Sequence, residues 1–126
     1  MDARKQTGFA SCQRPYCSPW GRVQEYSEIA PGIWSVSTAG HGGLAISAER
    51  DAAMPPYLRD GRKYGGPGYY EEDIEWALVA LAFPEAFAEK KPWQPMAPFE
   101  AAKLTVRQWF PEIWAQYQQA QGKEAA

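Results

Sequence analysis

The sequence has little of what a metal site, a disulfide framework or a membrane anchor needs. Among its 126 residues are two cysteines and a single histidine, His41. A structural zinc site usually takes four ligands, and Cys12 and Cys17 lack C-x-x-C spacing, so we expect no metal and no other cofactor. No apolar run reaches the roughly 18 residues of a membrane-spanning helix. Residues 1–17 also lack the apolar middle region of a signal peptide, which favours a cytoplasmic protein with reduced cysteines.

Charge and motifs are equally sparse. The formal net charge of −2 at pH 7 is too small to indicate a nucleic-acid or membrane partner. The sequence contains no G-x-S-x-G, no H-E-x-x-H and no phosphate-binding G-x-x-x-x-G-K-[ST]. These absences favour binding over catalysis.

Aromatic residues, by contrast, are plentiful. Six Trp, seven Tyr and five Phe suit a compact core, an aromatic binding face, or both. A chain of this length is most simply one domain. We expect a flexible N-terminal arm over residues 1–17, a single globular domain over residues 18–121, and a frayed tail over residues 122–126.

The first half of the domain has the pattern of β-strands. Alternation begins near Arg22, a second β-prone run follows at 33–38, and a third at 44–46. Three such strands need a helix over one face to be stable. The expected fold class is therefore α+β, with a small antiparallel three-stranded meander packed against three or four helices. Trp34 and Val36 are the expected buried face.

The second half of the domain has helical periodicity. Ser47 predicts the N-cap of a short helix ending at Pro55-Pro56. Apolar residues at spacings of three and four predict a helix from Glu71 to about residue 82, whose first turn holds Glu71, Glu72 and Asp73. Its stripe, with Leu78 and Leu81, is expected to pack on Trp34 and Val36. Pro84 should end this helix or open a short turn. A stripe over 99–117, interrupted by Pro111, predicts two consecutive helices.

Two glycine-rich loops carry the candidate binding residues. The first is the turn over 39–43, and the second spans 55–70, which is long for a connection in a compact domain. Tyr and Arg are typical of protein interface hot spots, so we expect the loops to form one protein-binding surface. Its candidate residues are His41, Tyr57, Arg59, Arg62, Tyr64 and Tyr69.

Other interpretations of these residues stay open. His41 could act as a general base with an acidic partner (Glu71, Glu72 or Asp73) in a small hydrolase or transferase, or could only hydrogen-bond within its turn. The Tyr/Arg loop could stack on single-stranded nucleic acid, which the near-neutral charge makes the weaker interpretation. Of the helical tryptophans, we expect Trp109 and Trp114 in the core and Trp76 as the exception.

Several short segments between residues 18 and 117 resemble a known family. They are SPWG, GIWSVST, HGG, Ser47 with Arg50, Met54-Pro55, EED, Trp76-Ala77 and LAFPE. The chain looks like uncharacterised small proteins encoded on phages, plasmids and integrated elements of proteobacteria. This resemblance implies a non-catalytic, protein-binding inhibitor of host defence machinery, similar in role to anti-CRISPR proteins. The implied partner is a host protein or protein complex, such as a CRISPR effector, in the bacterial cytoplasm.

Overall fold

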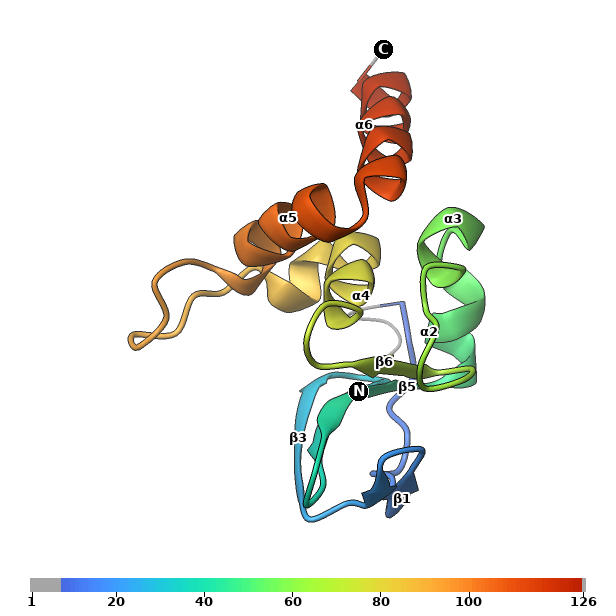
Figure 1. The fold of residues 1–126 in the computed structure, drawn as a ribbon, viewed down its shortest axis with the longest axis vertical. Helices are drawn as coiled ribbons and strands as arrows, with labels where there is room; N and C mark the ends of the chain where they lie inside the picture. Colours follow the sequence, from blue (N-terminus) through green and yellow to red (C-terminus); the bar gives the residue numbers. More distant parts are fainter. Residues whose placement is uncertain (1–7, 126) are drawn as a thin grey trace.

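The chain folds into an antiparallel sheet under a layer of helices (Figure 1). The computed structural model describes residues 8–125, with side chains described for residues 8–122. The strands are β1 (Cys17–Ser18), β2 (Gly21–Arg22), β3 (Glu25–Ala30), β4 (Ile33–Ser37), β5 (Gly42–Ile46) and β6 (Tyr69–Glu71). The helices are α2 (Ala48–Ala53), α3 (Pro56–Arg59), α4 (Trp76–Ala82), the 3-10 helix η1 (Pro84–Phe87), α5 (Pro98–Trp109) and α6 (Pro111–Ala125). The predicted α+β class is confirmed.

The sheet has one strand more than the predicted meander. Strands β3, β4 and β5 follow one another as expected, and β6 pairs antiparallel with β5, so the order is β3-β4-β5-β6. The prediction of a loop up to Tyr70 and a helix from Glu71 is wrong there. Leu44 of β5 pairs with Tyr70 of the additional strand β6. Without β6, the backbone N–H and C=O groups on the side of β5 that faces away from β4 would lack hydrogen-bond partners. This constraint comes from the tertiary structure, and the local sequence does not reveal it.

The face of the sheet that meets the helices is the opposite of the predicted one. Ile33, which is fully buried, pairs with Ile46, and both belong to the main core under α4. Trp34 and Val36 lie on the other face, in a smaller cluster with Val23. The predicted packing of Trp34 and Val36 on α4 is therefore wrong. Trp34 is larger than Ile33, but side-chain size within β4 does not decide which face of the sheet meets the helices. That face is decided by apolar cross-strand partners on other strands, such as Ile46 opposite Ile33.

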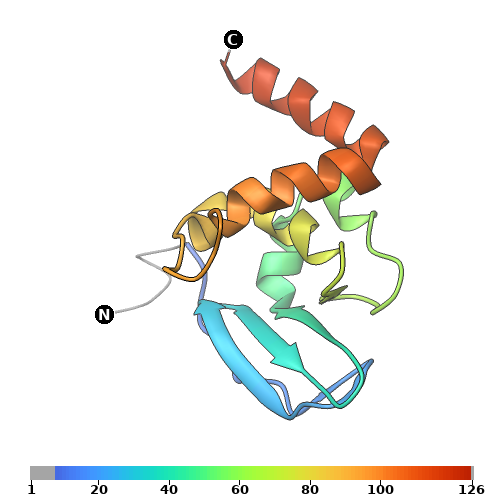
Figure 2. The same ribbon diagram turned by 60° about the vertical axis from the view of Figure 1, so that its left-hand side comes forward.

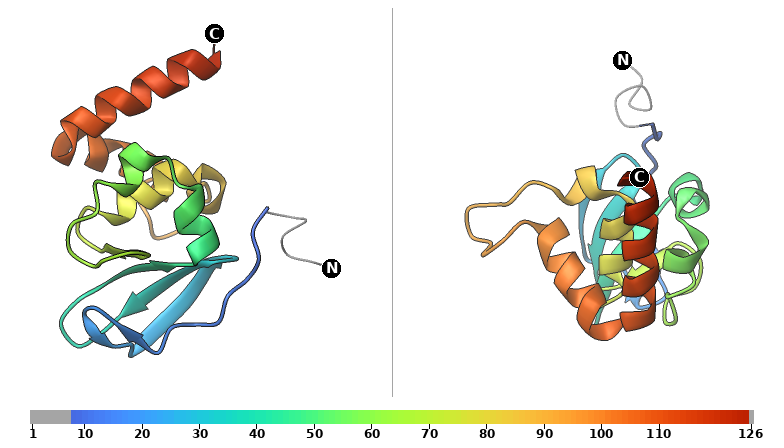
Figure 3. Two further views of the ribbon diagram at one scale, coloured as in Figure 1. Left: turned by 90° about the vertical axis from the view of Figure 1, so that its right-hand side faces the viewer. Right: turned by 90° about the horizontal axis from the view of Figure 1, so that it is seen from above.

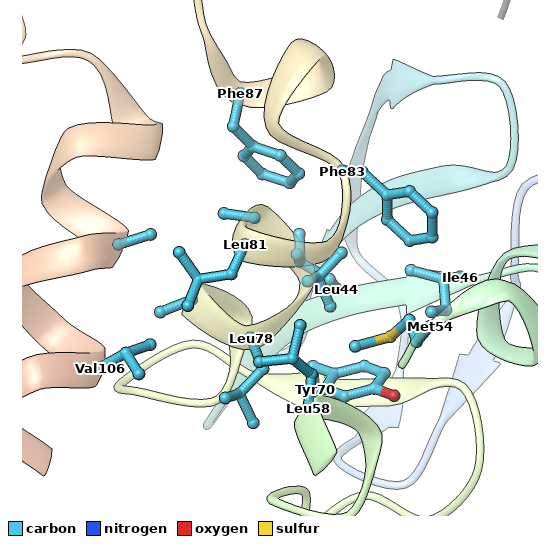
Figure 4. Packing of buried hydrophobic residues seen from close by; sticks show 14 of the residues in the cluster. Leu44, Ile46, Met54, Leu58, Tyr70, Leu78, Leu81, Phe83, Phe87 and Val106 are labelled. Carbon is cyan, nitrogen blue, oxygen red and sulfur yellow. The ribbon is translucent and has the colours of Figure 1, made fainter. Parts of the chain in front are cut away.

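Helix α4 lies between the sheet and α5. Figure 4 shows Leu78 and Leu81 between Val106 of α5 and the sheet residue Leu44. All residues from Ala77 to Leu81 are buried. The predicted single apolar stripe is thus too narrow, because a helix covered on two sides is apolar around most of its circumference. The predicted start at Glu71 is five residues too early, since residues 72–75 form a turn before the helix. Pro84 ends α4 and opens η1, as predicted.

The buried residue Arg50 ties the first strands to the helical layer. It is 2% exposed, and its guanidinium carbon lies 4.0 Å from the ring centroid of Phe9 and 4.7 Å from that of Phe83. Its Nε donates to the backbone oxygen of Pro31 at 2.9 Å. Burial lowers the pKa of Arg50, against the opposing charges of Glu85 and Glu49.

The turn beside Arg50 requires glycine. Gly32 has a φ of +86°, which L side chains rarely adopt. A Cβ there would lie 2.8 Å from Ser47 Oγ and 3.0 Å from Arg50 Cγ. Ser47 is the predicted N-cap of α2, and its Oγ accepts from the backbone N–H of Arg50. The strand turn and the start of α2 therefore meet in close contact.

The described part of the N-terminal segment lies against the domain. Its first seven residues are outside the described chain. Phe9 meets Phe83 edge to face with ring centroids 5.4 Å apart. The backbone N–H of Ala10 donates to Glu49 Oε1 at 3.0 Å, and the backbone oxygen of Cys12 accepts from the Trp34 indole at 3.2 Å. Phe9, Ala10 and Cys12, which belong to the predicted flexible arm over residues 1–17, therefore contact the globular domain.

The last two helices are separate, as Pro111 predicts. Phe110, with a φ of −133° and a ψ of 63°, is the non-helical residue between them. Ile113, Trp114 and Tyr117 of α6 pack against the main core, while the rest of α6 projects beyond the body of the domain (Figure 2). The helix continues through residues 122–125, within the predicted frayed tail. Within residues 8–125, no helix is long and apolar enough to cross a membrane.

Replacing Leu78 by alanine tests the position of α4. Leu78 is fully buried in the main core, so Leu78→Ala should lower the free energy of unfolding by about 2–5 kcal/mol. Leu104→Ala on α5 is the matched control, because Leu104 is exposed, and its effect should stay within about 0.5 kcal/mol. Denaturant unfolding measures both. Equal losses for the two variants would contradict the arrangement of layers.

Candidate functional site

The β4–β5 turn and the loop before β6 meet around an open hollow of about 520 Å³. We call it the aromatic–acidic hollow. Its walls come from the β1–β2 turn, the β4–β5 turn, the loop between α3 and β6, the turn before α4 and the end of α5. It is lined by Trp20, His41, Tyr64, Glu71, Asp73, Ile74 and Trp109. Segments far apart in the chain are thus brought to one place at the edge of the sheet.

Glycine at the start of β5 permits close approach rather than a special turn. A Cβ on Gly43 would lie 2.3 Å from the backbone oxygen of Tyr70 and 2.7 Å from Cη2 of Trp20. Gly40, Gly42 and Gly43 all lack a positive φ, so the β4–β5 turn does not use the conformational freedom of glycine. The role of Gly42 and Gly43 is steric, and at Gly43 the Trp20 ring lies directly over the backbone of β5.

His41 sits at the end of the β4–β5 turn with its ring exposed. Both the backbone N–H and the hydroxyl of Thr38 donate to the backbone oxygen of His41 at 2.7 Å. The His41 N–H in turn donates to Thr38 Oγ1 at 3.2 Å. The same hydroxyl lies 3.2 Å from the backbone oxygen of Trp20. Thr38 therefore fixes the backbone of His41 beside Trp20, and the imidazole stays open to a partner.

A network of backbone hydrogen bonds to two glutamates holds the acidic side of the hollow. Glu71 accepts from the backbone N–H groups of residues 73, 74 and 75 at 2.8–3.1 Å. Burial alone would raise the pKa of Glu71, but these three donors, with the nearby His41, hold it below its ordinary value. Glu71 therefore organises the turn before α4. The predicted role of the acidic residues in a helical first turn is wrong, since α4 begins only at Trp76.

Glu75 anchors the loop that carries Tyr64. Its side chain is buried, with the residue 1% exposed. Its Oε2 accepts from the backbone N–H of Lys63 at 2.5 Å, and its Oε1 accepts from that of Glu71 at 3.3 Å. Positive φ angles at Gly66 and Gly68 then turn the loop back into β6. Lys63, which precedes Tyr64, is thus fixed by its backbone to the start of α4, while Tyr64 itself is 71% exposed.

Aromatic rings form the rest of the wall. Tyr69 meets Trp20 edge to face with ring centroids 6.0 Å apart, and so supports it from the sheet. Trp109, at the end of α5, is 58% exposed. The prediction that Trp109 is a core residue and Trp76 the exception is wrong: Trp76 packs against the main core with its ring centroid 6.5 Å from that of Phe87.

The structure brings together some of the predicted binding residues and separates others. His41 and Tyr64 line the hollow, and Tyr69 lies behind its wall. Tyr57 is half-buried against the main core, and Arg59 lies 3.9 Å from Asp60. Arg62 is half-buried, with its guanidinium carbon 5.7 Å from the Tyr70 ring centroid and one buried nitrogen without a partner. These three do not line the hollow.

Sequence reasoning missed Trp20, Ile74 and Trp109 as parts of the hollow. Residues 102, 106 and 110 are spaced by four, which places Phe110 rather than Trp109 on the buried side of α5. A spacing of three from Val106 fits Trp109 equally well, so periodicity alone predicts both Trp109 and Phe110 on the apolar stripe of the helix. Pro111 is the available signal, since it predicts that the helix ends close to Trp109.

The lining of the hollow is mostly apolar and aromatic, with one imidazole and two carboxylates beside the rings. Its lining has no serine, threonine, cysteine or lysine that could act as a nucleophile. Among the residues with described side chains, the His41 ring forms no hydrogen bond to Glu71 or Asp73. The described part of the chain also holds no group of three His, Cys, Asp or Glu side chains suited to a metal ion.

A second, larger hollow lies on the helix-facing side of the sheet. Its volume is about 730 Å³, and it is bounded by serines of β3 and β4 and by residues of the segment over 88–97. That segment projects from the body of the domain (Figure 3). None of the predicted binding residues lines this second hollow.

The fold and the aromatic–acidic hollow define a small α+β domain with an open aromatic surface at the edge of its sheet. The chain belongs to the family described as a domain of unknown function, DUF7007, whose model matches residues 13–126. This agrees with the resemblance to an uncharacterised family. No curated protein and no solved structure matches the chain.

Replacing Glu71 by glutamine tests the hydrogen-bond network. Because the pKa of Glu71 is lowered by folding, its carboxylate stabilises the fold above the ordinary glutamate pKa of about 4.3, and this contribution is lost as pH falls through the lower, folded value. Unfolding measured from pH 7 to pH 3 should therefore show wild type more stable than Glu71→Gln near neutrality, with a gap that narrows in acid. A gap independent of pH would contradict the network.

Proposed function

We propose that this chain is a non-catalytic inhibitor from a mobile genetic element, which binds a component of the host's defence machinery as anti-CRISPR proteins do. The aromatic–acidic hollow and its rim are the proposed binding surface. The setting rests on the resemblance to small proteins of phages, plasmids and integrated elements. The mode of action rests on the geometry of the hollow.

The supporting observation is the meeting of two separate loops around exposed aromatic rings. Tyr64 and Trp109 are 71% and 58% exposed, and both line the same hollow as His41. Trp and Tyr contribute most of the binding energy in many protein interfaces, particularly beside a pocket. Large exposed aromatic side chains in one place are costly to leave in water, which is typical of a surface that a partner covers.

A small enzyme is the second candidate, because the structure places His41 near acidic residues. Glu71 and Asp73 line the same hollow, and the charge of His41 contributes to the lowered pKa of Glu71. The Glu71 carboxylate, however, is engaged by three backbone N–H groups. A nucleic-acid site is disfavoured at the hollow, where two carboxylates would repel phosphates.

Removing the two exposed rings tests the binding surface. Tyr64→Ala with Trp109→Ala should weaken capture of the host partner by about 30-fold or more, as loss of an interface hot spot of about 2 kcal/mol does. Both rings are largely exposed, so the free energy of unfolding should change by no more than about 0.5 kcal/mol. The measurements are affinity capture from host lysate, inhibition of a CRISPR interference assay, and thermal unfolding.

Trp93→Ala is the matched control for this experiment. Trp93 is 78% exposed and does not line the hollow, so its loss should leave capture and inhibition unchanged. Equal loss in Trp93→Ala and in the double variant would contradict the proposed surface. Turnover of a substrate that His41→Ala abolishes, with partner capture intact, would instead favour the enzyme.

A further inference from the structure

The aromatic–acidic hollow holds two carboxylates, those of Glu71 and Asp73. Its lining contains no lysine or arginine, and His41 is its one basic side chain. Among the residues with described side chains, no ion pair engages either carboxylate. Glu71 already accepts three backbone N–H bonds, whereas the exposed Asp73 carboxylate accepts none from described residues. Asp73 is therefore the carboxylate open to an incoming donor.

Three aromatic rings, those of Trp20, Tyr64 and Trp109, line the hollow with these carboxylates. A guanidinium or ammonium within about 6 Å of a ring centroid is attracted to an aromatic face. Elsewhere the chain pairs its own arginines with rings in this way: Arg14 lies 3.8 Å from the Tyr16 ring centroid and 4.0 Å from that of Tyr26. Among the described residues no cation lies over Trp20, Tyr64 or Trp109.

We propose that the aromatic–acidic hollow binds an arginine or lysine side chain of the protein partner. This inference rests on the proposed function and names the chemistry of the partner at the hollow. The cationic head pairs with Asp73, while the rings of Trp109 and Tyr64 cover the apolar stem and face the charge. Arginine fits best, because its planar guanidinium can stack on a ring and bond to a carboxylate at once.

A small cationic probe tests this chemistry without the partner. The probe is N-acetyl-arginine amide, and N-acetyl-citrulline amide is its neutral control of nearly the same shape. Titration of ¹⁵N-labelled protein, followed by the indole N–H signals of Trp20 and Trp109, gives the dissociation constant. The arginine probe should shift these two signals and the citrulline probe should not. Equal binding of both probes, or signals that do not move, would overturn the proposal.

Matched variants locate the cation. Asp73→Asn should weaken the arginine probe by about threefold to fivefold, as should Trp109→Ala or Tyr64→Ala. Together Asp73→Asn and Trp109→Ala should weaken it by about tenfold. Glu112→Gln and Trp93→Ala change an exposed acid and an exposed ring outside the hollow and should leave the dissociation constant unchanged. Equal weakening by these controls would show attraction to the surface in general and overturn the proposal.

The same variants separate this inference from the proposed function. Where Trp109→Ala abolishes capture of the host partner but Asp73→Asn and added salt do not weaken it, the protein-binding surface stands and the cation site fails. Where the arginine probe binds at Trp20 and Trp109 but every hollow variant retains the partner, the cation site stands and the proposed surface fails.

Discussion

A buried guanidinium connects three segments of this domain at one corner of its main core. Arg50 lies against the rings of both Phe9 and Phe83 and donates to the backbone oxygen of Pro31. Removing a cation from water costs several kcal/mol, and here the rings and the hydrogen bond offset that cost. The N-terminal segment, the β3–β4 turn and the end of α4 are consequently fixed to one side chain. The other end of α4, at Glu75, then fixes the walls of the hollow.

The sequence predicts the parts of the fold that depend on local chemistry. The α2 cap at Ser47, the break at Pro111 and the first three strands of the sheet follow from capping, proline geometry and β propensity. The sequence does not reveal β6 or the helix-facing side of the sheet. Both depend on cross-strand partners such as Ile46 for Ile33 and Leu44 for Tyr70, which lie more than ten residues apart.

The candidate site shows the same division. The sequence singled out His41 and Tyr64 because a lone imidazole and a tyrosine-rich loop are locally unusual, and both line the hollow. It also grouped Arg62 with them, although that side chain turns inward toward Tyr70. The sequence does not reveal Trp20 and Trp109 as site residues, because their positions depend on packing. Trp20 can lie against the sheet because Gly43 has no side chain. Phe110, rather than Trp109, packs against the main core.

The loop around Tyr64 has a fixed base and an exposed rim, and this separation has an evolutionary consequence. Its base is fixed by backbone hydrogen bonds to the buried carboxylate of Glu75, which do not depend on the side chains at the rim. Substitutions among exposed rim residues usually alter stability by only a few tenths of a kcal/mol. The identity of the rim can therefore drift while the scaffold persists. A lineage of such proteins could change the chemistry of this surface through a few side chains, without having to evolve a new fold.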